Sequence, residues 1–155
     1  MIKGEMKIPF YYQQTCWTCG AASLRMALEA LSIKKSEKEI VRLLKTNKRR
    51  GSYHRYFPIV AEKFKLNYIV MRNSSVDDVR ELISKRWIVI VNHFDNKMKV
   101  DHYVVVTKID KNYLYLNDPW YEEDRNDKIS IKEFKSIWHD TELEKGWLFA
   151  VRGGR

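Results

Sequence analysis

The sequence predicts an α+β fold in a single domain that covers residues 1–155. Helical patterns fill the first half of the chain, and strand-like runs fill the second half. This segregation is typical of folds in which helices pack on an antiparallel sheet. A chain of 155 residues can bury a sizeable core, and the 45% of hydrophobic residues indicates a globular protein.

Three helices are expected in the first half. The first covers 19–31, where apolar residues recur at helical spacing. A second opens at the capping box Ser36-Glu37-Lys38-Glu39 and continues to about residue 45. A third covers 56–64, because Pro58 would lie in its first turn, where proline is tolerated.

The second half is read from apolar runs and turn residues. The expected elements are a strand at 66–72, a helix at 75–84, strands at 87–91, 102–109 and 113–118, a helix at 132–138 and a strand at 147–152. The tripeptide Asp110-Lys111-Asn112 is a hairpin signal, so the strands on its two sides should pair antiparallel.

The net charge of +9 has two interpretations. Basic runs such as 45–50 could contact nucleic acid. A solvated surface rich in lysine and glutamate is favoured, because no nucleic-acid-binding motif accompanies the charge. No apolar run approaches the roughly 20 residues of a membrane span, and the first residues do not resemble a signal peptide. With two cysteines, we expect a reduced, cytoplasmic setting and no membrane partner.

Cys19 is the first candidate functional residue. It lies where a polar loop turns into the first helix, next to unpaired backbone N–H groups and the positive end of the helix dipole. Such a position favours the nucleophilic thiolate. A small buried residue at a helix start is the alternative, so catalysis also requires a base and an orienting carboxylate.

His102 and Asp118 can supply these two groups. His102 opens one strand of the expected hairpin, and Asp118 ends the other. A three-residue loop would pair Ile109 with Tyr113 and place Val104 opposite Asp118. His102 and Asp118 would then share one face, about 7–8 Å apart along a diagonal. A two-residue loop would put them on opposite faces, so the hypothesis depends on an odd loop length.

Gln13 is a candidate oxyanion donor. It precedes Cys19 by six positions, and Gln14 precedes it by five. A side-chain amide beside the nucleophile, together with the backbone N–H of Cys19, could stabilise the negative oxygen of a tetrahedral intermediate. Both glutamines could equally be ordinary loop residues.

These segments together resemble the bacteriocin-processing cysteine peptidases, which are papain-like double-glycine leader peptidases. The resemblance rests on Gln13, on Cys19 followed by Gly-Ala-Ala-Ser, on His102 before a valine-rich strand, and on Asp118 before proline. It implies a papain-like fold, with N-terminal helices packed on a C-terminal antiparallel sheet. It also implies Cys19 as nucleophile, His102 as general base and acid, Asp118 as orienter, Gln13 as oxyanion donor, and a peptide or protein substrate.

Other functions remain open from sequence. The same residues would serve transglutaminase-type acyl transfer or deamidation as well as hydrolysis. The fold could also persist as a catalytically silent peptide-binding module, or the chain could be a basic nucleic-acid binder. The sequence predicts no oligomeric state.

Cys16 and Cys19 form a Cys-x-x-Cys pair, which raises redox or zinc chemistry. Zinc would need two more ligands, and His54, His93 and His139 are scattered without ligand spacing. We therefore expect neither a metal nor a cofactor. A Cys16–Cys19 disulfide that blocks the nucleophile is the alternative role for the pair.

Overall fold

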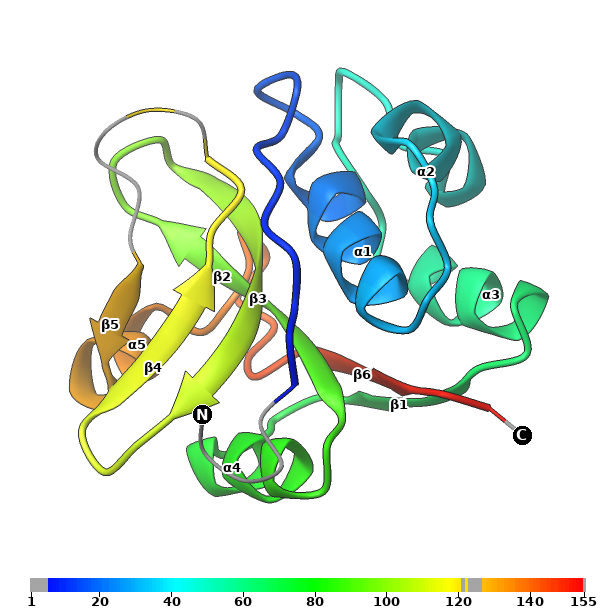
Figure 1. Cartoon of the computed structure of the whole chain (residues 1–155). Helices are drawn as coiled ribbons and strands as arrows, with labels where there is room; N and C mark the ends of the chain where they lie inside the picture. Colours follow the sequence, from blue (N-terminus) through cyan, green and yellow to red (C-terminus); the bar gives the residue numbers. More distant parts are fainter. Residues whose placement is uncertain (1–5, 121, 123–126, 155) are drawn as a thin grey trace.

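The structure is a computed structural model that describes residues 6–120, 122 and 127–154. Its elements are α1 (Cys19–Ala30), α2 (Glu37–Leu44), α3 (Tyr56–Lys63), β1 (Asn67–Met71), α4 (Val76–Ser84), β2 (Ile88–Asp95), β3 (Val100–Ile109), β4 (Tyr113–Asn117), β5 (Lys128–Ser130), α5 (Ile131–Ile137) and β6 (Leu148–Arg152). The expected order of helices before strands is therefore present, with α4 and α5 placed between strands (Figure 1).

The strands form one antiparallel sheet in the order β1-β6-β2-β3-β4-β5. Alternate residues of β2 separate the core into two parts. Ile88 and Ile90 pack with α1, α2 and α3 on one face. Val89 and Val91 pack with α4 and α5 on the other. The fully apolar run of β2 follows from this two-sided burial.

Two helices begin as their sequences predict. Ser36 caps α2 and Ser75 caps α4, each in a reciprocal capping box with the residue three positions on. The start of α1 differs, because the Thr18 side chain makes no cap hydrogen bond to the helix. Its hydroxyl instead contacts Thr15 in the preceding turn. The first turn of α1 therefore keeps N–H groups that no capping side chain occupies.

The β3–β4 hairpin corrects the expected loop. The backbone N–H of Asp110 bonds to the Tyr113 carbonyl at 3.0 Å, so the loop has two residues. The Asp110 carboxylate accepts the N–H groups of residues 112 and 113 and closes this tight turn.

The register near the end of β4 is nevertheless the expected one, because Val105 pairs with Asn117. A shift between Val106 and Lys108 leaves Thr107 as an extra residue in β3. This β-bulge compensates for the shorter loop. The expected odd loop length was therefore wrong. The strand pairing that this loop length was meant to produce is nevertheless present.

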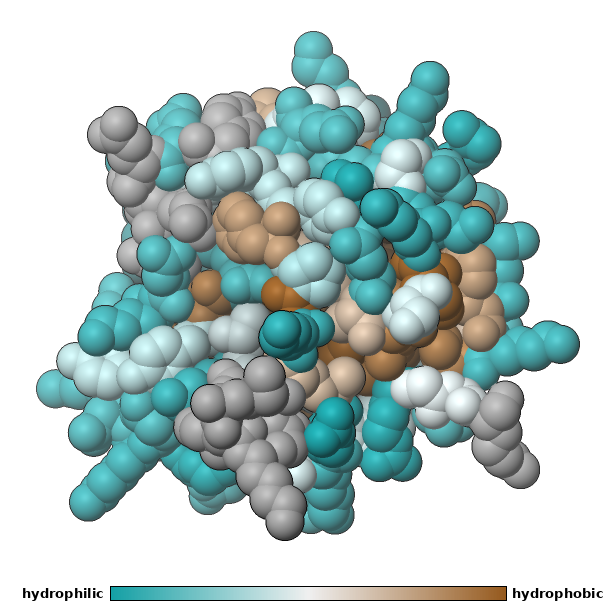
Figure 2. Space-filling model, viewed as in Figure 1, coloured by the Kyte–Doolittle hydropathy of each residue, from teal (hydrophilic) through white to brown (hydrophobic). Residues whose placement is uncertain are grey.

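Two further differences are small. The strand expected at 87–91 continues to Asp95, which lengthens the hairpin with β3. The short strand β5 was not expected, because three residues are too few to give a strand signal, and it pairs only with β4. In the described part of the chain, no helix is both long and apolar enough to cross a membrane. Figure 2 shows hydrophilic side chains over most of one face, with hydrophobic surface gathered toward its middle.

Candidate active site

Cys19 is the first residue of α1, and its side chain is partly buried. The helix start is held close to β3, because Ser23 donates from Oγ to the Tyr103 carbonyl at 3.2 Å. Gly20 permits this approach. A Cβ added there would lie 2.6 Å from the Ser52 Oγ and 3.1 Å from the Tyr103 ring. The glycine after the cysteine is thus required by packing.

His102 and Asp118 meet as the register argument predicts. The imidazole Nε2 lies 2.6 Å from Asp118 Oδ1, and both residues are buried. The backbone N–H of Trp120 donates to the same carboxylate oxygen at 2.9 Å. On its other side, the Cys19 side chain is close enough to the imidazole to raise the pKa of His102. Since Nε2 faces Asp118, Nδ1 is the nitrogen left for the sulfur.

Neighbouring charged groups shift the pKa values of His102 and Asp118. Burial alone would lower the pKa of His102, but the Cys19 sulfur and the Asp118 carboxylate outweigh it and raise the pKa to about 10. Burial would raise the pKa of Asp118, but the bond to His102 outweighs burial and holds this pKa below its usual value. The site therefore favours a protonated imidazole between two acceptors.

Gln13 is buried, and its backbone N–H bonds to the Pro119 carbonyl at 2.8 Å, next to Asp118. Its amide donates to the Thr15 carbonyl at 2.8 Å, and Oε1 is buried with no hydrogen-bond partner among the described residues. The second N–H of the amide remains to donate. Among the described residues, the amide bonds to neither Cys19 nor His102.

Gln14, the other candidate, is exposed. Its backbone N–H bonds to the buried carboxylate of Glu37, which ties the loop before α1 to α2. The buried Gln13 and the exposed Gln14 are therefore placed differently around the start of α1.

A second histidine lies beside this site. His54 Nδ1 is 2.7 Å from the Tyr103 hydroxyl, and its ring stacks on Trp147 with 4.0 Å between centroids. Burial lowers the pKa of His54 to about 4. The Tyr103 hydroxyl also lies 3.2 Å from the Ser52 carbonyl, which holds that loop against α1.

Sequence reasoning missed this cluster. It comes from three segments far apart in the chain, and only the position of Tyr103 directly after His102 could have pointed to it.

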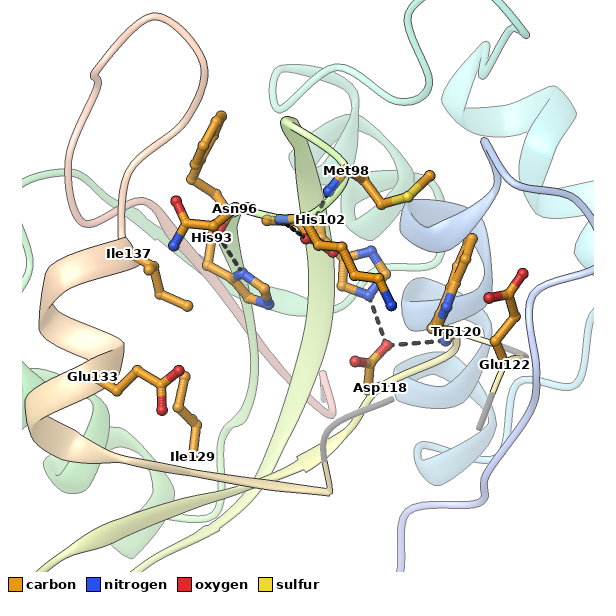
Figure 3. Close-up of a pocket in the computed structure, with 13 residues that line it drawn as sticks. His93, Asn96, Met98, His102, Asp118, Trp120, Glu122, Ile129, Glu133 and Ile137 are labelled. Atoms are coloured by element: carbon orange, nitrogen blue, oxygen red, sulfur yellow. Dashed lines mark hydrogen bonds and ion pairs between the residues drawn. The ribbon is translucent and has the colours of Figure 1, made fainter. Parts of the chain in front are cut away.

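A cavity of about 220 Å³ lies beside the His102–Asp118 pair, between the β2–β3 turn and α5 (Figure 3). Cys19 is not among its lining residues. Cys16 and Cys19 are both free, and Cys16 is exposed. Within the described ranges, no group of three His, Cys, Asp or Glu side chains is arranged to hold a metal ion.

The family model of the peptidase C39 family matches residues 7–144. No curated protein is significantly similar to the chain. Solved structures do resemble it. A double glycine motif protease from an AMS/PCAT transporter, in complex with the leader peptide, is 22% identical with a TM-score of 0.73, and the match covers 99% of this chain and 96% of that chain.

Two further solved structures have the same fold. The peptidase domain of Streptococcus ComA, a bifunctional ABC transporter involved in a quorum-sensing pathway, is 20% identical with a TM-score of 0.75, covering 96% of this chain and 100% of that one. A C39-like peptidase from Bacillus anthracis is 14% identical with a TM-score of 0.75, covering 95% and 96%. These likenesses show the papain-like fold.

Proposed function

Since this chain belongs to the peptidase C39 family and is a cysteine peptidase, we propose that it hydrolyses peptide bonds with Cys19 as nucleophile and His102 as general base and acid. Asp118 orients the imidazole, and Gln13 donates to the oxyanion. The observation that carries this proposal is the position of His102, whose imidazole bonds to the Asp118 carboxylate and lies close enough to Cys19 for its sulfur to raise the pKa of the ring.

The reaction that we propose begins with the proton on His102 and the Cys19 sulfur as the nucleophile. The raised pKa of His102 supports this state, because the ring then keeps its proton at neutral pH. The sulfur of Cys19 attacks the substrate carbonyl carbon, and the carbonyl oxygen gains negative charge. Asp118 keeps Nδ1 directed at the sulfur and stabilises the positive ring.

The oxyanion needs donors that are in place before the reaction. We assign the backbone N–H of Cys19, which lies in the uncapped first turn of α1, and the free amide N–H of Gln13. The side-chain amide of Gln13 is held by its hydrogen bond to the Thr15 carbonyl, and its backbone N–H is held by the Pro119 carbonyl. Its buried setting strengthens a hydrogen bond to a charged oxygen.

The tetrahedral intermediate collapses when His102 gives its proton to the leaving amine, and the C–N bond breaks. The acyl group then remains on the Cys19 sulfur as a thioester. His102, now neutral, takes a proton from water, which attacks the thioester and releases the acid. The sulfur leaves as thiolate and His102 is protonated again, so the starting pair is restored.

A peptide is the substrate class that we propose. The solved protease from the AMS/PCAT transporter holds a leader peptide, and we extend from it only the class of ligand. Both cysteines of this chain are free, as a reducing compartment such as the cytoplasm would keep them.

The test is cleavage of a peptide library, read by mass spectrometry, with four variants. Cys19→Ala should abolish cleavage. Asp118→Asn should lower kcat/KM by about 10²–10⁴-fold, because the imidazole loses its charged partner. Gln13→Ala should lower it by about 10²–10³-fold. Gln14→Ala is the matched control and should behave as the wild type. Cleavage by Cys19→Ala at the wild-type rate would overturn the proposal.

A further inference from the structure

A buried carboxylate holds the loop that carries Gln13. Glu37 is the first residue of α2, and only 2% of it is exposed. Both of its oxygens accept the backbone N–H of Gln14, at 3.1 and 3.2 Å. The segment before α1 runs between the sheet and the helices (Figure 1). The bond to Glu37 therefore ties this segment to the helical side of the molecule.

Two backbone anchors flank the Cα of Gln13. Its own N–H donates to the carbonyl of Pro119, just after β4, at 2.8 Å. The next peptide N–H along the chain, that of Gln14, donates to Glu37. Because peptide groups are planar, holding one on each side of a Cα fixes the direction of its Cα–Cβ bond. The bond of the amide to the Thr15 carbonyl then fixes the end of the Gln13 side chain.

The charge of Glu37 is costly to bury. Burial raises the pKa of this carboxyl, and the N–H of Gln14, the nearby Thr18 hydroxyl and the charge of Arg25 offset burial only in part. Its place in the first turn of α2, at the positive end of the helix dipole, favours the charged form. An apolar residue of similar volume would avoid the cost of burying this charge. Buried ionisable groups of this kind are typical of functional sites.

We propose that Glu37 is a positioning residue for catalysis, whose carboxylate holds the Gln13 amide at the place where the oxyanion forms. The inference rests on the proposed function, in which Gln13 is the oxyanion donor. Such a donor is effective when it is in place before the reaction and needs no reorganisation. A charged acceptor suits this task, because its hydrogen bond to a backbone N–H is roughly twice as strong as a neutral one.

A double-mutant cycle between Glu37→Ala and Gln13→Ala tests this role, with kcat and KM measured on a peptide that the wild type cleaves. Glu37→Ala should lower kcat by about 10–100-fold, since a misplacement of about 1 Å can cost about 100-fold. KM should stay within about threefold, because the interaction that is lost forms in the transition state. The double variant should be within about threefold of Gln13→Ala, because the donor that Glu37 positions is already absent. Losses that multiply would overturn the inference.

Glu37→Gln is the conservative variant. Its amide oxygen can still accept the N–H of Gln14, so kcat should stay within about tenfold of the wild type. Glu81→Gln, at an exposed carboxylate on α4, is the matched control and should behave as the wild type. Equal losses of kcat in Glu37→Gln and Glu37→Ala would contradict a role through this hydrogen bond.

Alkylation of Cys19 separates this role from a general loss of structure. Iodoacetamide reacts with the thiolate and forms no oxyanion, so its rate does not depend on Gln13. Because both cysteines are free, each variant is measured in a Cys16→Ala background, where only Cys19 can react. Glu37→Ala should be alkylated at the wild-type rate although its kcat falls. A fall in alkylation as large as the fall in kcat would overturn the inference.

The cycle also distinguishes this inference from the proposed function. A wild type that cleaves no peptide would overturn the proposed function, and the role of Glu37 with it. An active wild type whose losses multiply in the double variant would overturn the role of Glu37 alone.

Discussion

At the scale of single residues, the charge of His102 depends on the sulfur that it contacts. Burial lowers the pKa of this ring, and the Cys19 sulfur is the largest influence that raises it, to about 10. Cys19→Ala should therefore lower the pKa of His102, although Asp118 still opposes burial. An NMR titration of the imidazole measures this shift, with Cys16→Ala as the control at an exposed cysteine. The same titration curve in Cys19→Ala and the wild type would show that the pair does not interact.

Gly20 gives a second prediction at this scale. In an exposed helix, exchange of glycine for alanine stabilises by about 1 kcal/mol. Here the new Cβ would lie 2.6 Å from the Ser52 Oγ. The start of α1 must then move, and a shift of about 1 Å can reduce activity about 100-fold. Gly20→Ala should reduce kcat/KM to that extent. Adding Ser52→Gly should restore part of it.

The control for this prediction is Gly153→Ala, because nothing lies within 4 Å of a Cβ added there. It should leave kcat/KM unchanged. A fully active Gly20→Ala enzyme would mean that the contact between α1 and the Ser52 loop does not place the sulfur.

At the scale of elements, the β-bulge at Thr107 makes an unusual deletion tolerable. Without Thr107, the strand would run regularly from the turn at Asp110 to the pair Val105–Asn117, with the same partners as now. His102 and Asp118 would stay on one face. The deletion of Thr107 should therefore keep kcat/KM within about tenfold of the wild type, measured with the same peptide.

Deletion of Val105 is the contrasting variant. This residue lies in regular pairing, so its loss moves His102 by one position and turns its side chain to the other face. Circular dichroism measures the fraction of this variant that folds. Cleavage of the peptide should be absent even when it is corrected for that folded fraction. Equal effects of the two deletions would contradict the role assigned to the bulge.

The β3–β4 hairpin shows which features of the site can be predicted from the sequence and which cannot. The strand patterns and the turn residues predict the β3–β4 hairpin that carries His102 and Asp118, and capping patterns predict the starts of α2 and α4. The bulge at Thr107 could not be predicted from the sequence. The two-residue turn leaves one residue of β3 without a place in regular pairing, and the packing of the whole sheet determines which residue that is. The contacts of His54 with Tyr103 and of His93 with His102 also arise from segments that meet only in the folded chain. The sequence therefore identifies candidate reacting groups, whereas the contacts that support them are seen only in the fold.

At the scale of the whole molecule, the stability of the fold against acid depends on two buried histidines. Burial lowers the pKa of both His54 and His93 to about 4, from 6.5 in the unfolded chain. The unfolded state binds more protons between these values, so the free energy of unfolding falls as the pH drops from 6.5 through 4. His102 has a raised pKa and contributes fully throughout this range. The raised pKa values of Glu37 and Asp101 act in the opposite direction near its lower end.

Urea unfolding at pH 7.5 and at pH 5 measures this effect. The wild type should lose on the order of 1–2 kcal/mol for each of the two rings between pH 7.5 and pH 5. His54→Gln should lose less on acidification, because glutamine does not titrate, even though removal of the stacking on Trp147 lowers its stability at pH 7.5. If both proteins lose the same free energy between the two pH values, His54 is not buried as a neutral ring in solution. The packing of Tyr103 and Trp147 beside the active site would then need revision.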